Sequence, residues 1–296
     1  MNRFIFRNSP GLQYEFSAWK KSQNSDLIYS VCGPLSFSRF YKRCCLVSWV
    51  FRPPICAGAK LSITDPYHPK NLSAHKGFFC LTKSAQNYFS QFAPSKFIAW
   101  CVDQDMFDGK PPLQKPQKPF FLATGKTGRD YATLVNAAYQ NQAEIRIIGP
   151  KNQKPFNIPK NVIWIDTSSD PPDQAIDYPT LKEWYAQCSG VCIPLSGDAD
   201  DTCGYTNMLE AMAMRKPVLM TSSGSLHINP EIDGFGRQMK PRDAQGWVQE
   251  MNHLHEDHEK ALEMGNRGRK IVERDFTIER FNDDVLRFIG MLPTSL

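Results

Sequence analysis

The sequence lacks long apolar runs and the spacings of metal-binding residues. Its longest apolar stretch, Cys44–Phe51, is too short to span a bilayer. The first residues, MNRFIFRN, have no apolar segment of the secretory type. Nine cysteines occur singly or as the pair Cys44–Cys45, never as C-x-x-C, and together with six histidines they predict no metal site. An odd number of cysteines without a secretory signal predicts reduced thiols, so we expect a cytoplasmic protein.

Two nucleotide-binding fingerprints are missing as well. Gly125–Thr127 (GKT) is similar to the end of a P-loop, but the first glycine of that motif would have to stand where the chain has Phe120. G-x-G-x-x-G is absent, which excludes the dinucleotide fingerprint. No nucleic-acid-binding motif accompanies the basic residues, so we expect no nucleic-acid partner.

The composition, 41% hydrophobic and 22% charged, is typical of a globular protein, and 296 residues suffice for two domains. The formal net charge of +5 is unevenly distributed: residues 1–117 carry 15 lysines and arginines against 6 acidic residues, and the remainder carries 20 against 24. The basic half is either an ordinary solvated surface or a face for an anionic acceptor or an anionic membrane. The membrane interpretation places the protein peripherally at the inner membrane face.

Short apolar runs alternate with helical patterns, which predicts an α/β fold. Residues 109–119 (GKPPLQKPQKP) are rich in proline and lysine without apolar periodicity and predict a linker. We therefore divide the chain into domains 1–117 and 118–296. Residues 1–25 are weakly patterned. The expected strands are 26–32, 45–51, 77–81 and 97–102 in the first domain, and 120–124, 143–149, 161–166, 191–195 and 218–221 in the second.

The segment 191–221 predicts a strand, a polar loop, a helix from about Thr206 to Met214, and a second strand. In a parallel sheet this loop and helix N-terminus open at the carboxyl edge, where such sheets bind ligands. The unpaired N–H groups of a helix N-terminus suit a phosphate, and a carboxylate one turn further, Glu210, can accept from two sugar hydroxyls. Alternatively, Asn207 and Glu210 form a capping pair, N-x-x-E, without any ligand.

A basic pair, Lys126 and Arg129, stands at the turn between the expected strand 120–124 and the helix that follows. Taken alone, this pair fits a solvated lysine and an ion pair between Arg129 and Asp130. Further along, Trp184 and Tyr185 lie on an expected helix, 178–187, where aromatic residues pack more often than they stack on a ligand.

Residues 204–221, GYTNMLEAMAMRKPVLMT, resemble the donor-site signature of retaining GT-B glycosyltransferases of the group 1, family 4 type, G-x-x-x-LEAMA-x-GKPVI-x-T. Residues 124–134, TGKTGRDYATL, resemble the end of the first donor-domain strand in that family. Residues 81–107 resemble the end of its acceptor domain, with Asp103 and Phe107 matching and Trp100–Cys101 replacing an Asn–Gly pair. The resemblance implies a GT-B fold of two Rossmann-like domains: a reduced acceptor domain and a donor domain.

The resemblance also implies a site. Glu210 would hold the donor ribose, residues before the helix would hold the diphosphate, and the basic pair would neutralise the diphosphate as it leaves. The implied catalytic residues are Lys126, Arg129 and Glu210, with Glu210 positioning rather than reacting. The implied donor-binding residues are Gly125, Lys126, Arg129, Gly204, Tyr205, Thr206 and Glu210.

The implied reaction is hexosyl transfer from a UDP- or GDP-linked sugar to a sugar, lipid or protein acceptor, as in polysaccharide or glycolipid biosynthesis. It retains the anomeric configuration and requires no obligatory metal or cofactor. Two features depart from the family. A glutamate eight positions before Glu210 is replaced by Thr202, for which Asp200 or Asp201 would substitute, and the N-terminal stretch shows no glycine-rich acceptor loop. The alternatives are a catalytically silent GT-B-like protein that binds nucleotide or a partner, and a non-transferase GT-B enzyme such as an epimerase or phosphorylase.

Overall fold

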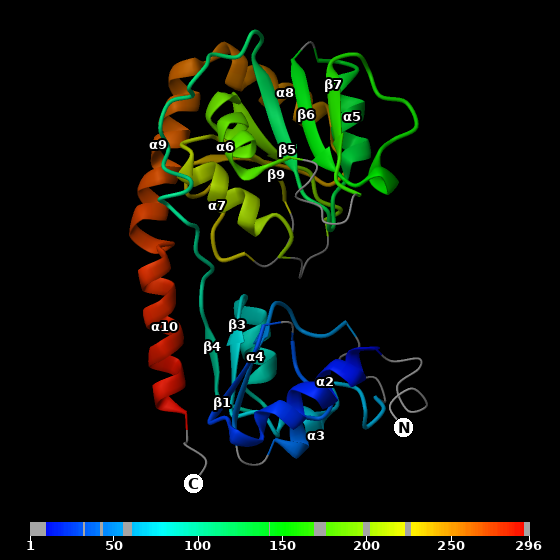
Figure 1. Ribbon diagram of the computed structural model, residues 1–296. Helices are drawn as coiled ribbons and strands as arrows, with labels where there is room; N and C mark the ends of the chain where they lie inside the picture. Colours follow the sequence, from blue (N-terminus) through cyan, green and yellow to red (C-terminus); the bar gives the residue numbers. More distant parts are fainter. Residues whose placement is uncertain are drawn as a thin grey trace. The chain divides into compact units, whose positions relative to one another are not determined.

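The computed structural model shows two compact α/β units, one of residues 1–99 with 281–296 and the other of residues 100–280 (Figure 1). The linker predicted at 109–119 lies within the second unit. Among the described residues, no helix has the length and apolar content needed to cross a membrane. The structure describes residues 10–31, 33–41, 44–55, 61–141, 143–168, 176–197, 202–222 and 226–292.

The first unit contains a four-stranded parallel sheet in the order β1-β2-β3-β4. The sequence predicted β1 to β3 closely, but it placed the fourth strand at 97–102. The chain leaves the sheet after Phe97 because Val102 N–H donates to the carbonyl of Phe276 instead. The strands are β1 (Leu27–Ser30), β2 (Cys45–Val50), β3 (Gly77–Cys80) and β4 (Ser95–Phe97).

Helices of the first unit cover aromatic side chains of this sheet. The Trp49 ring of β2 stacks on Phe79 and on Phe281, with centroid separations of 5.2 and 5.7 Å. Buried His75 bridges two loops, because Nδ1 donates to the carbonyl of Asn71 and Nε2 accepts from the N–H of Leu35. The helices are α2 (Pro10–Lys21), which the sequence pattern did not predict, α3 (Pro69–Leu72), α4 (Lys83–Phe89) and the part of α10 (Ile278–Met291) from residue 281 on.

The second unit contains a six-stranded parallel sheet in the order β10-β9-β8-β5-β6-β7. The chain runs from central β5 outward to β7 and then returns to the other side of β5 for β8, β9 and β10. The carboxyl ends of β5 and β8 therefore meet at a topological switch point, where open parallel sheets bind ligands. The strands are β5 (Phe120–Thr124), β6 (Glu144–Gly149), β7 (Val162–Asp166), β8 (Gly190–Ile193), β9 (Val218–Thr221) and the unexpected β10 (Gly236–Met239).

Helices pack in pairs around the second sheet, α5 against α8 and α7 against α9. The α7–α9 approach requires glycine at 265, because a Cβ atom there would collide with the carbonyl oxygen of Arg215. Cys188 and Cys192 are buried core residues, as predicted. The helices are α5 (Tyr131–Ala138), α6 (Tyr178–Gln187), α7 (Tyr205–Ala213), α8 (Ala244–Glu256) and α9 (His258–Asp275).

Helix α7 ends in a Schellman motif that contains an unusual residue. The N–H of Lys216 donates to the carbonyl of Ala211 at 2.9 Å, and the N–H of Arg215 donates to that of Met212 at 3.1 Å. This geometry places Arg215 in the left-handed region, with φ of 57°. Glycine usually occupies such a position because it has no Cβ atom. The end of α7 therefore contains local backbone strain.

Candidate functional site

The turn after β5 and the start of α7 meet at the switch point of the second sheet. Arg129 lies in this turn, and its backbone forms an isolated antiparallel bridge with Leu195, just beyond β8. Its guanidinium donates from Nε to the carbonyl of Thr124 at 3.1 Å and from Nη1 to that of Thr127 at 2.9 Å. Since both acceptors belong to the same turn, the half-buried guanidinium is held across the carboxyl end of β5.

Gly125 makes this position of the guanidinium sterically available. Its φ of 130° lies in a region that side chains rarely adopt, and a Cβ atom there would collide with the Arg129 guanidinium. The hydroxyl of Tyr131 donates to the Gly125 carbonyl at 2.8 Å, and this hydrogen bond fixes the conformation of the turn. Gly125 and Arg129 therefore form one local unit.

Asn207 of α7 joins this turn to the helix. Its Oδ1 accepts from Nη2 of Arg129 at 2.5 Å, and its Nδ2 donates to the hydroxyl of Thr124 at 2.5 Å. Nδ2 also lies 3.5 Å from Oε2 of Glu210. The interpretation of Asn207 as a capping residue is wrong, because α7 begins after Gly204 and Asn207 is already its third residue. The Arg129–Asp130 ion pair is not formed either, since Asp130 caps α5 through the N–H and hydroxyl of Thr133.

Glu210 is half-buried, and one of its oxygens is fixed by α6. The Tyr185 hydroxyl donates to Oε2 at 2.7 Å. Burial raises the pKa of the Glu210 carboxyl, while the hydrogen bonds from Tyr185 and Asn207 oppose that rise. Burial and the neighbouring Glu210 raise the pKa of the Tyr185 phenol well above its ordinary value, so the phenol remains a donor. Within the described part of the chain, no group bonds Oε1 of Glu210, so this oxygen can accept from a ligand.

The start of α7 provides backbone donors rather than side-chain contacts. Gly204 is the N-cap residue with φ of 84°, and a Cβ atom there would lie 2.5 Å from Cγ2 of Ile193. No described residue accepts from the backbone N–H groups of Thr206 and Asn207, the donors that a helix N-terminus offers an anion. The Tyr205 side chain is instead buried, with its ring against those of His227 and Phe276, so only its backbone can face a ligand.

The remaining predicted residues are less constrained. Lys126 lies at the same turn with an exposed side chain, and its carbonyl accepts from Nε2 of Gln153 at 2.6 Å. Asp200 and Asp201, the suggested substitutes for the missing glutamate, lie outside the described residues. Within the part of the chain that is described, no cluster of three His, Cys, Asp or Glu side chains is arranged to hold a metal ion.

Tyr185 and Asn207 belong to the site but were not predicted as site residues from the sequence. Tyr185 was expected to pack, and it does, but its hydroxyl also fixes Glu210. The sequence feature that could have indicated this contact is the hydroxyl of Tyr185 itself. A tyrosine at a fully buried position needs a polar partner for its hydroxyl, which a phenylalanine does not. Asn207 was noted only for its spacing from Glu210. Its link to Arg129 depends on tertiary structure and could not be read from the spacing.

Comparisons with known proteins agree with this architecture. Residues 129–257 match the family model described as glycosyl transferases group 1. No curated protein matches the sequence. Sucrose-phosphate synthase from Thermosynechococcus elongatus is similar in structure, with a TM-score of 0.69, 16% identity, and coverage of 97% of this chain and 79% of that one.

Two further solved structures are similar. Anabaena HepE in complex with UDP-glucose has a TM-score of 0.63 at 14% identity, covering 94% of this chain and 82% of that chain. WaaG, a glycosyltransferase involved in lipopolysaccharide biosynthesis, has a TM-score of 0.68 at 13% identity, covering 96% and 84%. At these identities the likeness concerns the fold alone. Residues 129–257 are thus similar to a glycosyl transferases group 1 domain, and the chain has the GT-B fold, with its smaller sheet in the N-terminal unit.

Proposed function

We propose that this protein is a retaining, nucleotide-sugar-dependent hexosyltransferase whose donor binds at the switch point of the second unit. The observation that carries the proposal is the bonded series from Arg129 through Asn207 to Glu210. It joins a cation, a helix N-terminus and a carboxylate in one place. A nucleoside diphosphate sugar has the complementary groups, since its diphosphate is anionic and its ribose presents two neighbouring hydroxyls.

In this proposal, the guanidinium and the α7 N-terminus bind the diphosphate. Described residues accept from three of the five N–H donors of Arg129, and the other two can bind phosphate oxygens. Negative charge grows on the diphosphate as the sugar departs, and a preorganised donor lowers such a barrier by about 3 kcal/mol. Lys126, exposed at the same turn, adds a second cation.

Glu210 positions the donor without taking part in bond making. Oε2 is occupied by the Tyr185 hydroxyl, so Oε1 accepts from the ribose. Since a protonated carboxyl loses acceptor capacity, and burial raises the pKa of Glu210, donor affinity should fall on acidification at a higher pH than for an exposed glutamate.

The acceptor side is proposed from fold and charge. The smaller first unit contributes most of the basic excess of residues 1–117, which suits an anionic sugar, lipid or protein acceptor or contact with an anionic membrane. The similar structures include an enzyme of lipopolysaccharide biosynthesis. We therefore place the activity in polysaccharide or glycolipid synthesis.

The test is a panel of UDP- and GDP-linked sugars scored by thermal shift and by slow donor hydrolysis. We expect one sugar nucleotide to stabilise the protein and to be hydrolysed. Glu210→Ala should abolish both effects and Arg129→Ala should weaken binding about tenfold or more, because a charge-assisted hydrogen bond contributes about 1.5–3 kcal/mol. Arg129→Lys keeps the charge and controls for misfolding.

Glu250→Ala is the matched control, since Glu250 lies on α8 and pairs with Arg237 rather than with the site. Binding without hydrolysis or transfer would indicate a silent donor-binding protein. Absence of binding by every sugar nucleotide would contradict the proposed function.

A further inference from the structure

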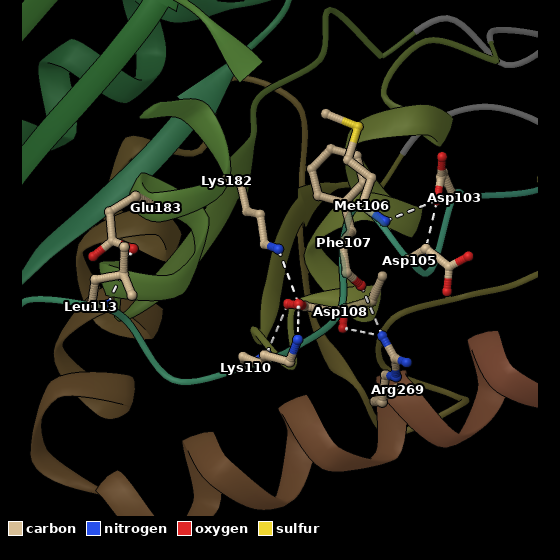
Figure 2. Close-up of polar contacts among 11 residues, drawn as sticks. Asp103, Asp105, Met106, Phe107, Asp108, Lys110, Leu113, Lys182, Glu183 and Arg269 are labelled. Atoms are coloured by element: carbon tan, nitrogen blue, oxygen red, sulfur yellow. Dashed lines mark hydrogen bonds and ion pairs between the residues drawn. The ribbon is translucent and has the colours of Figure 1, made fainter. Parts of the chain in front are cut away.

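Residues 103–107, just before the predicted linker, form a closed turn, the linker turn, within the second unit. Oδ1 of Asp103 accepts from the N–H groups of Asp105 and Met106 at 3.1 and 2.9 Å, and the Asp103 carbonyl accepts from the N–H of Phe107 at 2.9 Å (Figure 2). Asp103 therefore supplies the turn chemistry that Trp100–Cys101 cannot.

Arg269 of α9 fastens this turn to α7. The side chain is buried, and Nη1 donates to the carbonyl of Phe107 at 2.8 Å and to that of Ala213, the last residue of α7, at 2.9 Å (Figure 2). Nε of Arg269 pairs with Glu273 at 2.6 Å. A single guanidinium thus holds the linker turn and the helix that carries Glu210.

The turn is also clamped to α6. Asp108 pairs with Lys110 at 2.9 Å and with Lys182 of α6 at 3.0 Å. Burial alone would raise the pKa of Asp108, but these two ammonium groups lower it well below the ordinary carboxyl range. Three residues after Lys182 on α6, the ring of Tyr185 contacts Phe107 edge to face, with a centroid separation of 5.8 Å and an interplanar angle of 86°.

We infer that Phe107 is a positioning residue for Glu210, acting through the ring of Tyr185. Phe107 is buried, with its backbone fixed by Arg269 and its ring against Tyr185, and the Tyr185 hydroxyl bonds Oε2 of Glu210. The linker turn thereby sets the direction of the carboxylate that receives the donor. The inference rests on the proposed function for its ligand, but not for its geometry.

Substitution of Phe107 distinguishes a ring that only fills space from a ring that positions the Glu210 carboxylate. Replacing Phe107 by leucine leaves apolar volume but removes the edge-to-face contact, so the Tyr185 ring gains freedom and its hydroxyl bonds Glu210 less well. If Phe107 acts through that hydroxyl, its substitution should matter only while the hydroxyl is present. Non-additivity of the two substitutions is therefore the diagnostic property.

The experiment is a double-mutant cycle of Phe107→Leu and Tyr185→Phe on the affinity for UDP-glucose or GDP-glucose, whichever the wild type binds. We expect Phe107→Leu alone to weaken binding about fivefold, typical of an aromatic pair, and to have less than about a twofold effect in the Tyr185→Phe background. Phe121→Leu, at a buried position of β5 in the core with α5 and α8, should leave affinity unchanged.

A second measurement needs no ligand. The free energy of urea unfolding is measured against pH for the wild type and for Glu210→Gln. The difference between the two curves is the contribution of Glu210 to the pH dependence. The hydrogen bond from Tyr185 lowers the pKa of Glu210, so weakening this bond raises that pKa. Both Tyr185→Phe and Phe107→Leu should therefore shift the contribution of Glu210 to higher pH. The only other charged group connected to this carboxylate among the described contacts is Arg129, through Asn207, and it is the same in all variants.

Equal effects of Phe107→Leu in both backgrounds, or an unmoved pH profile, would overturn the inference while leaving donor binding intact. If the wild type binds no donor but the pH shift is observed in the variants, the result would contradict the proposed function and support the positioning role of Phe107.

Discussion

Replacing Arg215 by glycine should leave the protein more stable than replacing it by alanine, because this arginine occupies the left-handed position of the Schellman motif that ends α7. Its φ is 57°, and both hydrogen bonds of the motif are formed, so the conformation is imposed by the fold. The Arg215 side chain is exposed, and its Nη1 donates to Oδ1 of Asn266 at 3.0 Å. Glycine would keep the backbone conformation and remove the steric conflict at Cβ, together with this side-chain hydrogen bond.

The magnitude follows from two opposing contributions. A non-glycine residue in the left-handed region costs about 1–2 kcal/mol. Glycine, however, makes the unfolded chain more flexible, which costs about 0.4–1 kcal/mol of stability. The side-chain hydrogen bond is lost in both Arg215→Gly and Arg215→Ala. Comparing these two variants therefore isolates the backbone effect, and we expect the glycine variant to be more stable than the alanine variant by about 1 kcal/mol.

Urea unfolding of the wild type and both variants measures this difference. Arg242, with φ of 62°, is a second left-handed residue on which the same glycine–alanine comparison can be repeated. If Arg215→Ala proves as stable as Arg215→Gly, the left-handed conformation carries no cost at this position and the reasoning fails.

Three further predictions concern the site, the α7–α9 contact and acid stability. Asn207→Ala should weaken sugar-nucleotide binding about tenfold in a calorimetric titration, because Arg129 and Glu210 lose their common partner; unchanged affinity would contradict this. Gly265→Ala should cost more than about 2 kcal/mol in urea unfolding, because the methyl group meets backbone, whereas Gly290→Ala, with nothing within 4 Å of the new Cβ, should be neutral or stabilising. Burial lowers the pKa of His75 from 6.5 to about 4, so its stabilisation is complete above pH 6.5 and falls on acidification; between pH 7 and 5 the wild type should lose about 2 kcal/mol that His75→Gln does not lose.

The sequence predicted β5, β8 and β9 closely because each is a short apolar run whose residues are all buried. It did not predict β10, Gly236–Met239, because the strand GRQM is largely polar and is recognisable only by its pairing with β9. Helix α2 was missed for a similar reason, since aromatic and charged residues are mixed along it without a clear apolar stripe.

For the site, spacing in the sequence was informative only where the contacting residues are close neighbours in the chain. The start of α7 was predicted to within one residue, and Arg129 lies in the turn between β5 and α5, where the sequence placed it. The partner of Arg129 could not be predicted. The sequence suggests the neighbouring Asp130, whereas the guanidinium bonds Asn207, which is distant in sequence and close only in the folded structure. The connection from Phe107 to Glu210 joins segments far apart in sequence, so only the folded structure reveals it.

In the proposed function, Arg129 and the start of α7 together bind a diphosphate. The most direct measurement compares the affinity of the wild type and Arg129→Gln for UDP or GDP, whichever binds better, with their affinity for the corresponding nucleoside. We predict that the substitution weakens diphosphate binding about tenfold or more and leaves nucleoside binding unchanged, because in the proposed site the guanidinium contacts the diphosphate and not the nucleoside. Equal losses for both ligands, or no loss for either, would contradict the account.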